Sequence, residues 1–205
     1  MARSLAKDHS DKRRAILKTA AAFFADTGYD RAAMSQLAKA CGISKASIYH
    51  YYTNKETLLY DILHHHLDEL LTTIQAQDIS DKDPETNLGT LAGALLEVYR
   101  GADAEHRLQL EAMRYLPAES QKELADMQRQ IVAIFGDSIR AVAPELFETG
   151  EADLRAVTMS MFGMLNWFYL WHQPSKGLSR AEYAKLATDI LVGGLIKLKI
   201  PAHVK

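Results

Sequence analysis

The stretch that decides the fold is residues 28–59, GYDRAAMSQLAKACGISKASIYHYYTNKETLL. A first short helix is predicted by four apolar residues at helical spacing, Met34, Leu37, Ala38 and Cys41. Gly42 ends that helix, and Ser44 caps a second one whose Ile48 and Tyr52 face inward. Two short helices joined by a glycine turn are the layout of a helix-turn-helix, which places its second helix in the major groove of DNA.

Helical spacing continues on both sides of this stretch. A helix over residues 10–27 is predicted, with Ser10 as its N-cap and Gly28 as its left-handed stop. Thr53, with Glu56 three residues later, reads as a capping box that opens a longer helix. The apolar stripe of that helix runs through Leu59, Ile62, Leu63, Leu67, Leu70, Leu71 and Ile74. This long helix is expected to join the small N-terminal unit to the rest of the chain.

The remainder of the chain also has the helical period, and no strand alternation is seen, so the predicted fold class is all-α. Asp83-Pro84 is an N-cap followed by proline at the first helical position, and it begins a helix toward Arg100. Ser179 and Glu182 form a second capping box. Further helices are predicted at about residues 104–116, 118–142, 152–172 and 179–198.

Charge is divided unevenly along the chain. Residues 1–60 hold 10 Lys and Arg against 5 Asp and Glu, whereas residues 61–205 hold 14 against 21. A basic first quarter on an acidic remainder predicts a nucleic-acid contact at one end only.

The second helix of the motif offers the contacts. Lys45 and Ser47 lie in its first turn, and the next three residues point to successive faces, so at least one of these must face away from the core. Lys55 opens the following helix and is placed for a phosphate. The predicted DNA-binding residues are Ser44, Lys45, Ser47, Tyr49, His50, Tyr51 and Lys55. The alternative is an ordinary helix pair, because a glycine-ended helix before a serine-capped one also occurs in proteins that never touch DNA.

The first 60 residues resemble the DNA-binding domain of the TetR family of transcriptional regulators. The matching residues are Phe23, Phe24, Gly28, Tyr29, Leu37, Ala38, Gly42, Ile43, Ser44, Ile48, Tyr49, Tyr52, Lys55 and Glu56. The chain departs from the family where Ala32 and Ala33 replace the usual Thr and Ser, and where Ala46 replaces a common Gly. The departures remove a hydroxyl contact to phosphate and some room for close approach to DNA.

The resemblance implies a helix-turn-helix DNA-binding domain over residues 1–55, with the motif at about 33–52, and a helical ligand-binding and dimerisation domain over residues 56–205. It also implies nine or ten helices, a homodimer on a palindromic operator, and usually a repressor that lets go when a small molecule binds. The homodimer has support in the residues themselves. Ala156–Trp171 is apolar on all sides and Gly193-Gly194 permits close helix approach, so two helices from each subunit are expected to form a four-helix bundle. The alternative is that these helices are the core of a monomer.

The effector site is expected among the methionines and aromatic residues of the C-terminal domain, most of which are ordinary core. Residues 163–174, GMLNWFYLWHQP, resemble a TetR subgroup that controls fatty-acid, phenylacetate or sterol breakdown and senses acyl-CoA thioesters. An acyl-CoA or a similar amphipathic molecule is therefore the expected effector. Candidate ligand-binding residues are Met113, Arg114, Met127, Met164, Asn166, Trp167, Phe168 and Trp171.

The sequence leaves two other classes of protein as alternatives, a metal-dependent enzyme and a helical adaptor. Three consecutive helical residues point about 100° apart, so His64-His65-His66 cannot converge on one metal ion, and no cofactor or metal is expected. The basic first quarter argues against an adaptor without DNA binding. No signal peptide or membrane span is apparent, so the expected location is cytoplasmic. The single Cys41 is expected to be a small buried residue, with a reactive thiol as the alternative.

Overall fold

The computed structural model describes residues 2–79, 82–148, 151–173 and 175–198. Within these ranges the chain forms helices and no β-strand, which confirms the predicted all-α class. The α-helices are α1 (Ala2–Thr27), α2 (Met34–Ala40), α3 (Lys45–Tyr51), α4 (Lys55–Gln75), α5 (Pro84–Val98), α6 (Asp103–Glu111), α7 (Ala118–Val142), α8 (Glu151–Trp171) and α9 (Arg180–Lys197). Two 3-10 turns, η1 (Met113–Tyr115) and η2 (Pro144–Phe147), stand on either side of α7.

The chain divides into two compact units. The first comprises Met1–Asp68 and Gly101–Asp126, and the second comprises Glu69–Arg100 and Met127–Lys205. Two of the three boundaries fall inside helices, α4 and α7, so each of these helices contributes to both units, and the third falls between α5 and α6. These units differ from the predicted DNA-binding and ligand-binding domains, which meet between residues 55 and 56. That domain boundary stays a prediction.

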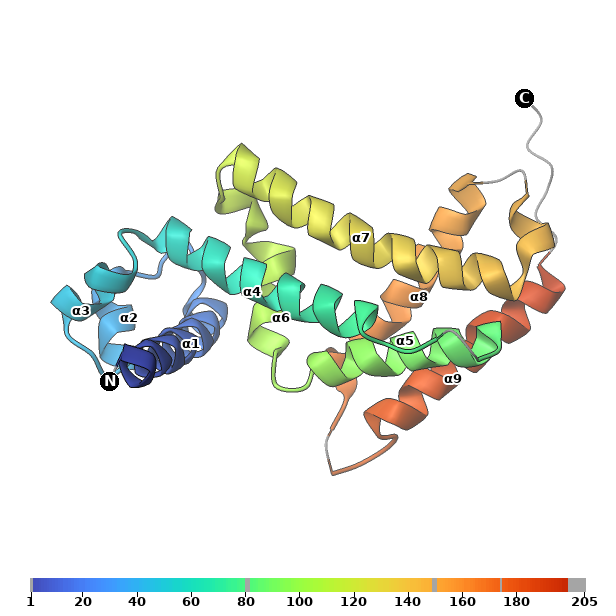
Figure 1. The fold of residues 1–205 in the computed structure, drawn as a ribbon, viewed down its shortest axis with the longest axis horizontal. Coiled ribbons are helices and arrows are strands. Elements are labelled where there is room, and N and C mark those ends of the chain that lie inside the picture. The colour runs from blue at the N-terminus through green and yellow to red at the C-terminus, as the bar shows by residue number, and fades with distance from the viewer. Residues whose placement is uncertain (1, 80–81, 149–150, 174, 199–205) are drawn as a thin grey trace. The chain divides into compact units, whose positions relative to one another are not determined.

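The first unit has its core where α1 meets α2 and α6, and where α2 meets α3 (Figure 1). Ala20, Phe24, Leu37 and Ile48 are almost completely buried there. Gly28 stops α1 as predicted, with a φ of +84° and its N–H bonded to the carbonyl of Phe24 at 2.9 Å. The predicted start of this helix is wrong, however, because α1 begins at Ala2 and Ser10 lies inside it.

The cap of α4 is also one residue away from its predicted place. Asn54 Oδ1 accepts the N–H of Thr57 at 2.8 Å, and the hydroxyl of Thr57 donates to the Asn54 carbonyl at 3.0 Å. The N-cap is therefore Asn54 and not Thr53, and α4 begins at Lys55. Its predicted apolar stripe is buried from Leu59 to Ile74, apart from the half-buried Leu71.

The second unit is built on the antiparallel pair of α5 and α9, which lie side by side (Figure 1), with α8 packed on α9. Two glycines of α5 allow the close approach. A Cβ at Gly93 would lie 4.0 Å from the Cβ of Ala184, and one at Gly89 would lie 3.9 Å from the side chain of Thr188. The predicted starts of both helices are confirmed, since Asp83 accepts the Thr86 N–H and Ser179 with Glu182 forms a capping box.

Cys41 is half-buried rather than fully buried, and burial raises the pKa of its thiol. A raised pKa leaves less of the reactive thiolate at neutral pH, which favours the structural interpretation of this residue. None of the helices in the described part of the chain is both long and apolar enough to cross a membrane.

Candidate nucleic-acid interface

The turn between α2 and α3 is a Schellman motif centred on Gly42. The N–H of Ile43 donates to the carbonyl of Ala38 and the N–H of Gly42 donates to that of Lys39, each at 3.0 Å. Gly42 has a φ of +66°, a left-handed conformation that L side chains rarely adopt. This glycine therefore fixes the angle at which α3 leaves α2.

Ser44 caps α3 as predicted. Its Oγ accepts the N–H of Ser47 at 3.0 Å and lies 2.8 Å from the Ser47 hydroxyl. The two predicted contact residues Ser44 and Ser47 are thus joined to each other. Their first role is to hold the start of a helix of only seven residues.

One side of α3 faces solvent. Ile48 and the C-cap residue Tyr52 are buried, whereas Lys45, Ala46, Tyr49 and His50 are exposed. The Lys45 ammonium lies 5.9 Å from the centre of the Tyr49 ring, which is 43% exposed. We call this set of four residues the α3 face. It combines a cation, a phenol and an imidazole, which together can hydrogen-bond to phosphates and base edges.

Tyr51 and Lys55 are less exposed than the residues of the α3 face. The Tyr51 ring is half-buried and meets His50 edge-on at 5.8 Å. The Lys55 ammonium donates to the carbonyls of Tyr29 at 3.2 Å and Asp30 at 3.1 Å, and lies 4.7 Å from the centre of the Tyr29 ring. Lys55 therefore uses two of its three N–H donors to hold the turn after α1. A phosphate contact by this residue stays a prediction, and only one donor remains for it.

A polar network that sequence analysis did not anticipate holds α3 from behind. Asp61 on α4 accepts a hydrogen bond from the Tyr52 hydroxyl and a charged one from Arg13 on α1, the latter at 2.5 Å. Burial raises the pKa of Tyr52, and the neighbouring Asp61 carboxylate raises it further, so the phenol stays protonated and donates. Three helices of the first unit thus meet at one carboxylate. Arg13 and Asp61 are 48 residues apart in the sequence, so no local sequence pattern predicts their ion pair.

The predicted ligand-binding residues fall in different surroundings. In the second unit the Asn166 amide oxygen accepts a 2.9 Å hydrogen bond from the Tyr99 hydroxyl, and Phe168 is buried in a stack with Tyr183 at 4.6 Å. Met127 and Met164 are half-buried. Trp167 and Trp171 instead lie on the surface of α8, 65% and 49% exposed.

The two remaining candidates lie in the first unit, on η1. Met113 is half-buried there, and Arg114 is exposed, with its guanidinium 3.3 Å from the Tyr115 hydroxyl. None of the eight ligand-binding candidates lines the two hollows found beside α5 in the second unit.

The three consecutive histidines also diverge. His66 is buried and lies 6.4 Å from the ring of His106 on α6, His65 is exposed, and His64 lies 3.8 Å from Glu123. Burial, followed by the neighbouring His106 and His65, lowers the pKa of His66 to about 3. Among the described residues no three His, Cys, Asp or Glu side chains are grouped closely enough to hold a metal ion.

Comparison with known protein families matches both parts of the chain. Residues 16–62 match the family of bacterial regulatory proteins named tetR, and residues 81–195 match the tetracyclin repressor-like C-terminal domain. The second match alone covers more than half of the chain.

Known relatives agree with this. The transcriptional repressor KstR2 of Mycobacterium tuberculosis is 23% identical over 192 residues, which cover 92% of this chain and 94% of that protein. Two uncharacterized Bacillus subtilis regulators match over shorter stretches, and the aligned residues span only 26% and 32% of their lengths.

Solved structures share the fold over most of the chain. A TetR-family transcriptional regulator from Bordetella parapertussis has a TM-score of 0.83 at 29% identity, covering 92% of this chain and 97% of that one. AibR, solved in complex with isovaleryl coenzyme A and operator DNA, has a TM-score of 0.72 at 26% identity, covering 88% of this chain and 98% of that one.

Proposed function

Because the chain belongs to the TetR family of non-enzymatic, DNA-binding transcriptional regulators, we propose that it is a homodimeric repressor that releases a palindromic operator when a small amphipathic molecule binds. The observation that carries the DNA-binding part is the α3 face. A capped helix of two turns, held from behind by Tyr52 and Asp61, turns Lys45, Tyr49 and His50 outward. Such a helix fits the major groove with its exposed side chains against the bases and phosphates.

The roles within the α3 face follow from the chemistry of its side chains. Lys45 supplies a charge to a phosphate or to guanine acceptors, while His50 and Tyr49 supply donors and acceptors on the same side of the helix. Ser44 and Ser47 act mainly by fixing the helix start, and Tyr51 and Lys55 contribute from its margins.

The test is a titration of the protein against the DNA duplex upstream of its own gene. Binding is measured by fluorescence anisotropy at several salt concentrations. Lys45→Ala and Tyr49→Ala should each weaken binding at least several-fold. Loss of one phosphate contact by Lys45 should also lower the slope of log K against log salt by about 0.9. Lys122→Ala, an equal loss of charge at an exposed site on α7, is the matched control. If folded and dimeric Lys45→Ala and Tyr49→Ala proteins bind as the wild type does, the α3 face is not the reading surface.

The dimer is proposed to form through the exposed apolar face of α8 and α9. This dimer face consists of Met159, Gly163, Trp167, Leu170 and Trp171 on α8, and of Leu186, Ile190, Gly193 and Gly194 on α9. No neighbouring side chain lies within 4 Å of the Cβ positions of Gly163, Gly193 and Gly194, so the helices offer bare backbone there. Apolar side chains around glycines are what a second copy needs for close helix packing, and two-fold half-sites require two copies.

The effector is proposed to be an acyl-CoA thioester or a similar amphipathic molecule. The support is the likeness to AibR, which was solved with isovaleryl coenzyme A, and to KstR2, described as a ketosteroid transcriptional regulator. The candidates that remain in the second unit are Met127, Met164, Asn166 and Phe168. Among these apolar side chains, the hydrogen-bonded pair of Tyr99 and Asn166 supplies the polar group for the effector. The exposed Trp167 and Trp171 fit the dimer face better. Because α4 contributes to both units, it is the proposed path from ligand to α3.

A thermal-shift screen with acyl-CoA thioesters and the matching free acids tests the effector class. A thioester that binds only the folded protein should raise the melting temperature, and the increase should continue to grow with the logarithm of the thioester concentration above its Kd. The same thioester should release the upstream duplex in the anisotropy assay. If no thioester raises the melting temperature while DNA binding is intact, the acyl-CoA assignment fails and the regulator assignment stands.

A further inference from the structure

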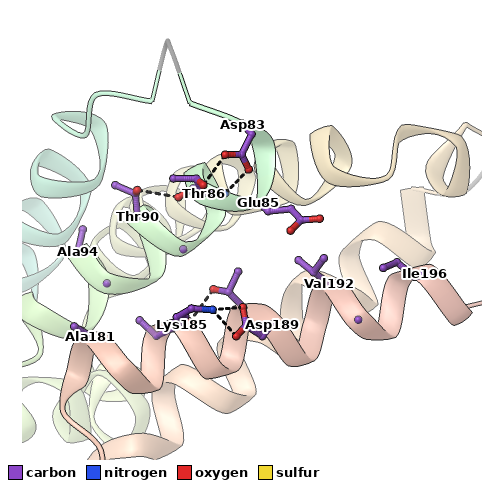
Figure 2. A pocket seen from close by; sticks show the side chains of 15 residues that line it. Asp83, Glu85, Thr86, Thr90, Ala94, Ala181, Lys185, Asp189, Val192 and Ile196 are labelled. Atoms are coloured by element: carbon purple, nitrogen blue, oxygen red, sulfur yellow. Dashed lines mark hydrogen bonds and ion pairs between the residues drawn. The ribbon is translucent and has the colours of Figure 1, made fainter.

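A groove of about 690 Å³ runs between α5 and α9 in the second unit. Its lining includes no residue of the α3 face and no effector candidate, and it shares Gly193 with the edge of the dimer face. Figure 2 shows its two walls, with Glu85, Thr86 and Thr90 on one side and Lys185 and Asp189 on the other. Its floor consists of small residues, among them Gly89, Gly93 and Ala184. The floor is thus apolar and free of large side chains at these positions, a surface suited to an aliphatic chain.

The hydroxyl groups of the groove act as acceptors toward any ligand. Thr86 Oγ1 donates to Asp83 Oδ2 at 2.6 Å, Thr90 Oγ1 donates to the Thr86 carbonyl at 2.8 Å, and Thr188 Oγ1 donates to the Ala184 carbonyl at 2.8 Å. Since each hydroxyl has one proton, these three have no donor left. A ligand that meets them must bring its own hydrogens.

Carboxylates stand along the same groove. Asp83 and Glu85 lie at the start of α5, and Asp189 lies across from them on α9 (Figure 2). Hydrogen bonds from Thr86 lower the pKa of Asp83, so its carboxylate is charged at neutral pH. The lining of the groove is therefore rich in negative charge and in acceptors.

A second hollow of about 570 Å³ continues the groove, because the two share Gly93, Ala94 and Ala181. It adds Glu69 and Glu97 at the far end. With a rise of 1.5 Å per residue, α5 spaces Asp83 and Glu97 about 21 Å apart. Carboxylates thus recur at both ends and in the middle of one elongated channel.

We propose that this groove binds a linear aliphatic di- or polyamine. Such a molecule has ammonium groups separated by short methylene chains. The ammonium groups would donate to Glu85, Asp189 and the threonine oxygens, and the methylene segments would lie on the glycine and alanine floor. This ligand class and these residues are separate from operator and effector binding.

The chain's own ammonium groups already use these acceptors. Lys185 Nζ lies 2.7 Å from Asp189 Oδ2, and Lys82 Nζ donates to Thr90 Oγ1 at 3.4 Å. Both lysines are exposed. The Lys185–Asp189 ion pair is a surface pair, which contributes little free energy, and the Lys82–Thr90 hydrogen bond is long, so a ligand with several ammonium groups can displace both lysines. The two lysines are thus competitors of the ligand, and removing one should strengthen binding.

Isothermal titration of the full chain with spermidine, without DNA and at constant ionic strength, tests the proposal. Wild-type protein should bind at one site, and the double variant Glu85→Gln/Asp189→Asn should bind at least tenfold more weakly. Glu145→Gln/Glu148→Gln removes the same charge from exposed positions outside the groove and should bind as the wild type does. Lys185→Met should bind several-fold more tightly, and Ala94→Leu, which fills the groove without changing charge, should bind more weakly.

Three results would overturn the proposal. The first is equal spermidine binding by the wild type and the Glu85→Gln/Asp189→Asn protein, with both shown to be folded by circular dichroism. The second is displacement of spermidine by magnesium at the same concentration of charge, which would indicate general attraction to an acidic surface. The third is unchanged binding by Ala94→Leu. Because the assay contains no DNA and no thioester, failure here leaves the regulator assignment untouched.

Discussion

Asp61 is the residue whose carboxylate joins the end of α3 to α1 and α4. Its carboxylate accepts from Tyr52, at the end of α3, and from Arg13 on α1. Asp61→Asn keeps the shape but loses the charge that strengthens both hydrogen bonds. We expect the free energy of unfolding to fall by about 1 to 2 kcal/mol, measured by urea denaturation.

The control for this change is Asp68→Asn, an identical substitution at an exposed position of the same helix. It should leave stability within about 0.5 kcal/mol of the wild type. Equal urea midpoints for the two variants would mean that the Asp61 network does not contribute to stability.

His66 makes the stability of the protein depend on pH. Burial and the neighbouring His106 and His65 lower its pKa from 6.5 to about 3. Between these two values the unfolded chain binds a proton that the folded chain does not, so stability falls as pH falls below 6.5. From pH 7 to pH 5.5 this group should remove about 1 kcal/mol from the free energy of unfolding.

Urea midpoints of the wild type and of His66→Gln across that range check the prediction. The variant should lose this part of the pH dependence, whereas His65→Gln, at the adjacent exposed position, should keep it. A wild-type profile that stays flat from pH 7 to pH 5.5 would contradict the assignment.

At the scale of residues, the sequence predicted which side chains face the core better than it predicted their hydrogen-bond partners. The inward positions of Ile48 and Tyr52 follow from helical period, and the structure confirms them. Asp61 as the partner of Tyr52, and the Tyr29 carbonyl as the acceptor for Lys55, depend on the tertiary fold. No local pattern contains that information.

At the scale of elements, helix starts were predictable where a single cap was available. Asp83-Pro84 and the Ser179–Glu182 box have one good N-cap each, and both were predicted correctly. At α4, Thr53 and Asn54 are both capping residue types, and Glu56 favoured the wrong one. At α1 the serine at position 10 resembles a cap, yet the helix continues back to Ala2.

Paired substitutions distinguish the two caps of α4. Asn54→Ala removes the acceptor of the Thr57 N–H and should cost about 1 kcal/mol in the free energy of unfolding. Thr53→Ala should be nearly neutral, because the structure gives it no capping bond. Thermal and urea denaturation of both proteins provide the measurement. A larger loss for Thr53→Ala would return the cap to its sequence-predicted place.

At the scale of the whole molecule, the all-α class and the basic N-terminal quarter were visible in the sequence because both are sums over many residues. The compact units were not visible, since residues 101–126 join the N-terminal segment only through tertiary packing. The apolar character of α8 on all sides predicted a helix covered either by a second copy or by the core of a monomer. Trp167 and Trp171 lie on the surface of the single chain, which agrees with cover by a second copy.

That exposure leads to the prediction that belongs to the whole molecule. Ile190, 56% exposed, lies in the dimer face, and Ile190→Asp would place a charge between the two copies. Burying an unpaired carboxylate there costs several kcal/mol, which is enough to dissociate a dimer at micromolar concentration. Light scattering should give twice the 22.9 kDa chain mass for the wild type and the single chain mass for the variant.

Leu110→Asp is the matched control, because Leu110 is 62% exposed on α6, outside the dimer face. This variant should remain dimeric and bind DNA as the wild type does. Monomeric Ile190→Asp protein should lose most of its operator affinity although its α3 face is intact. Each monomer then binds one half-site independently, and the gain in affinity from two linked α3 helices on one operator is lost. A dimeric Ile190→Asp protein beside a monomeric Leu110→Asp protein would move the interface to α6.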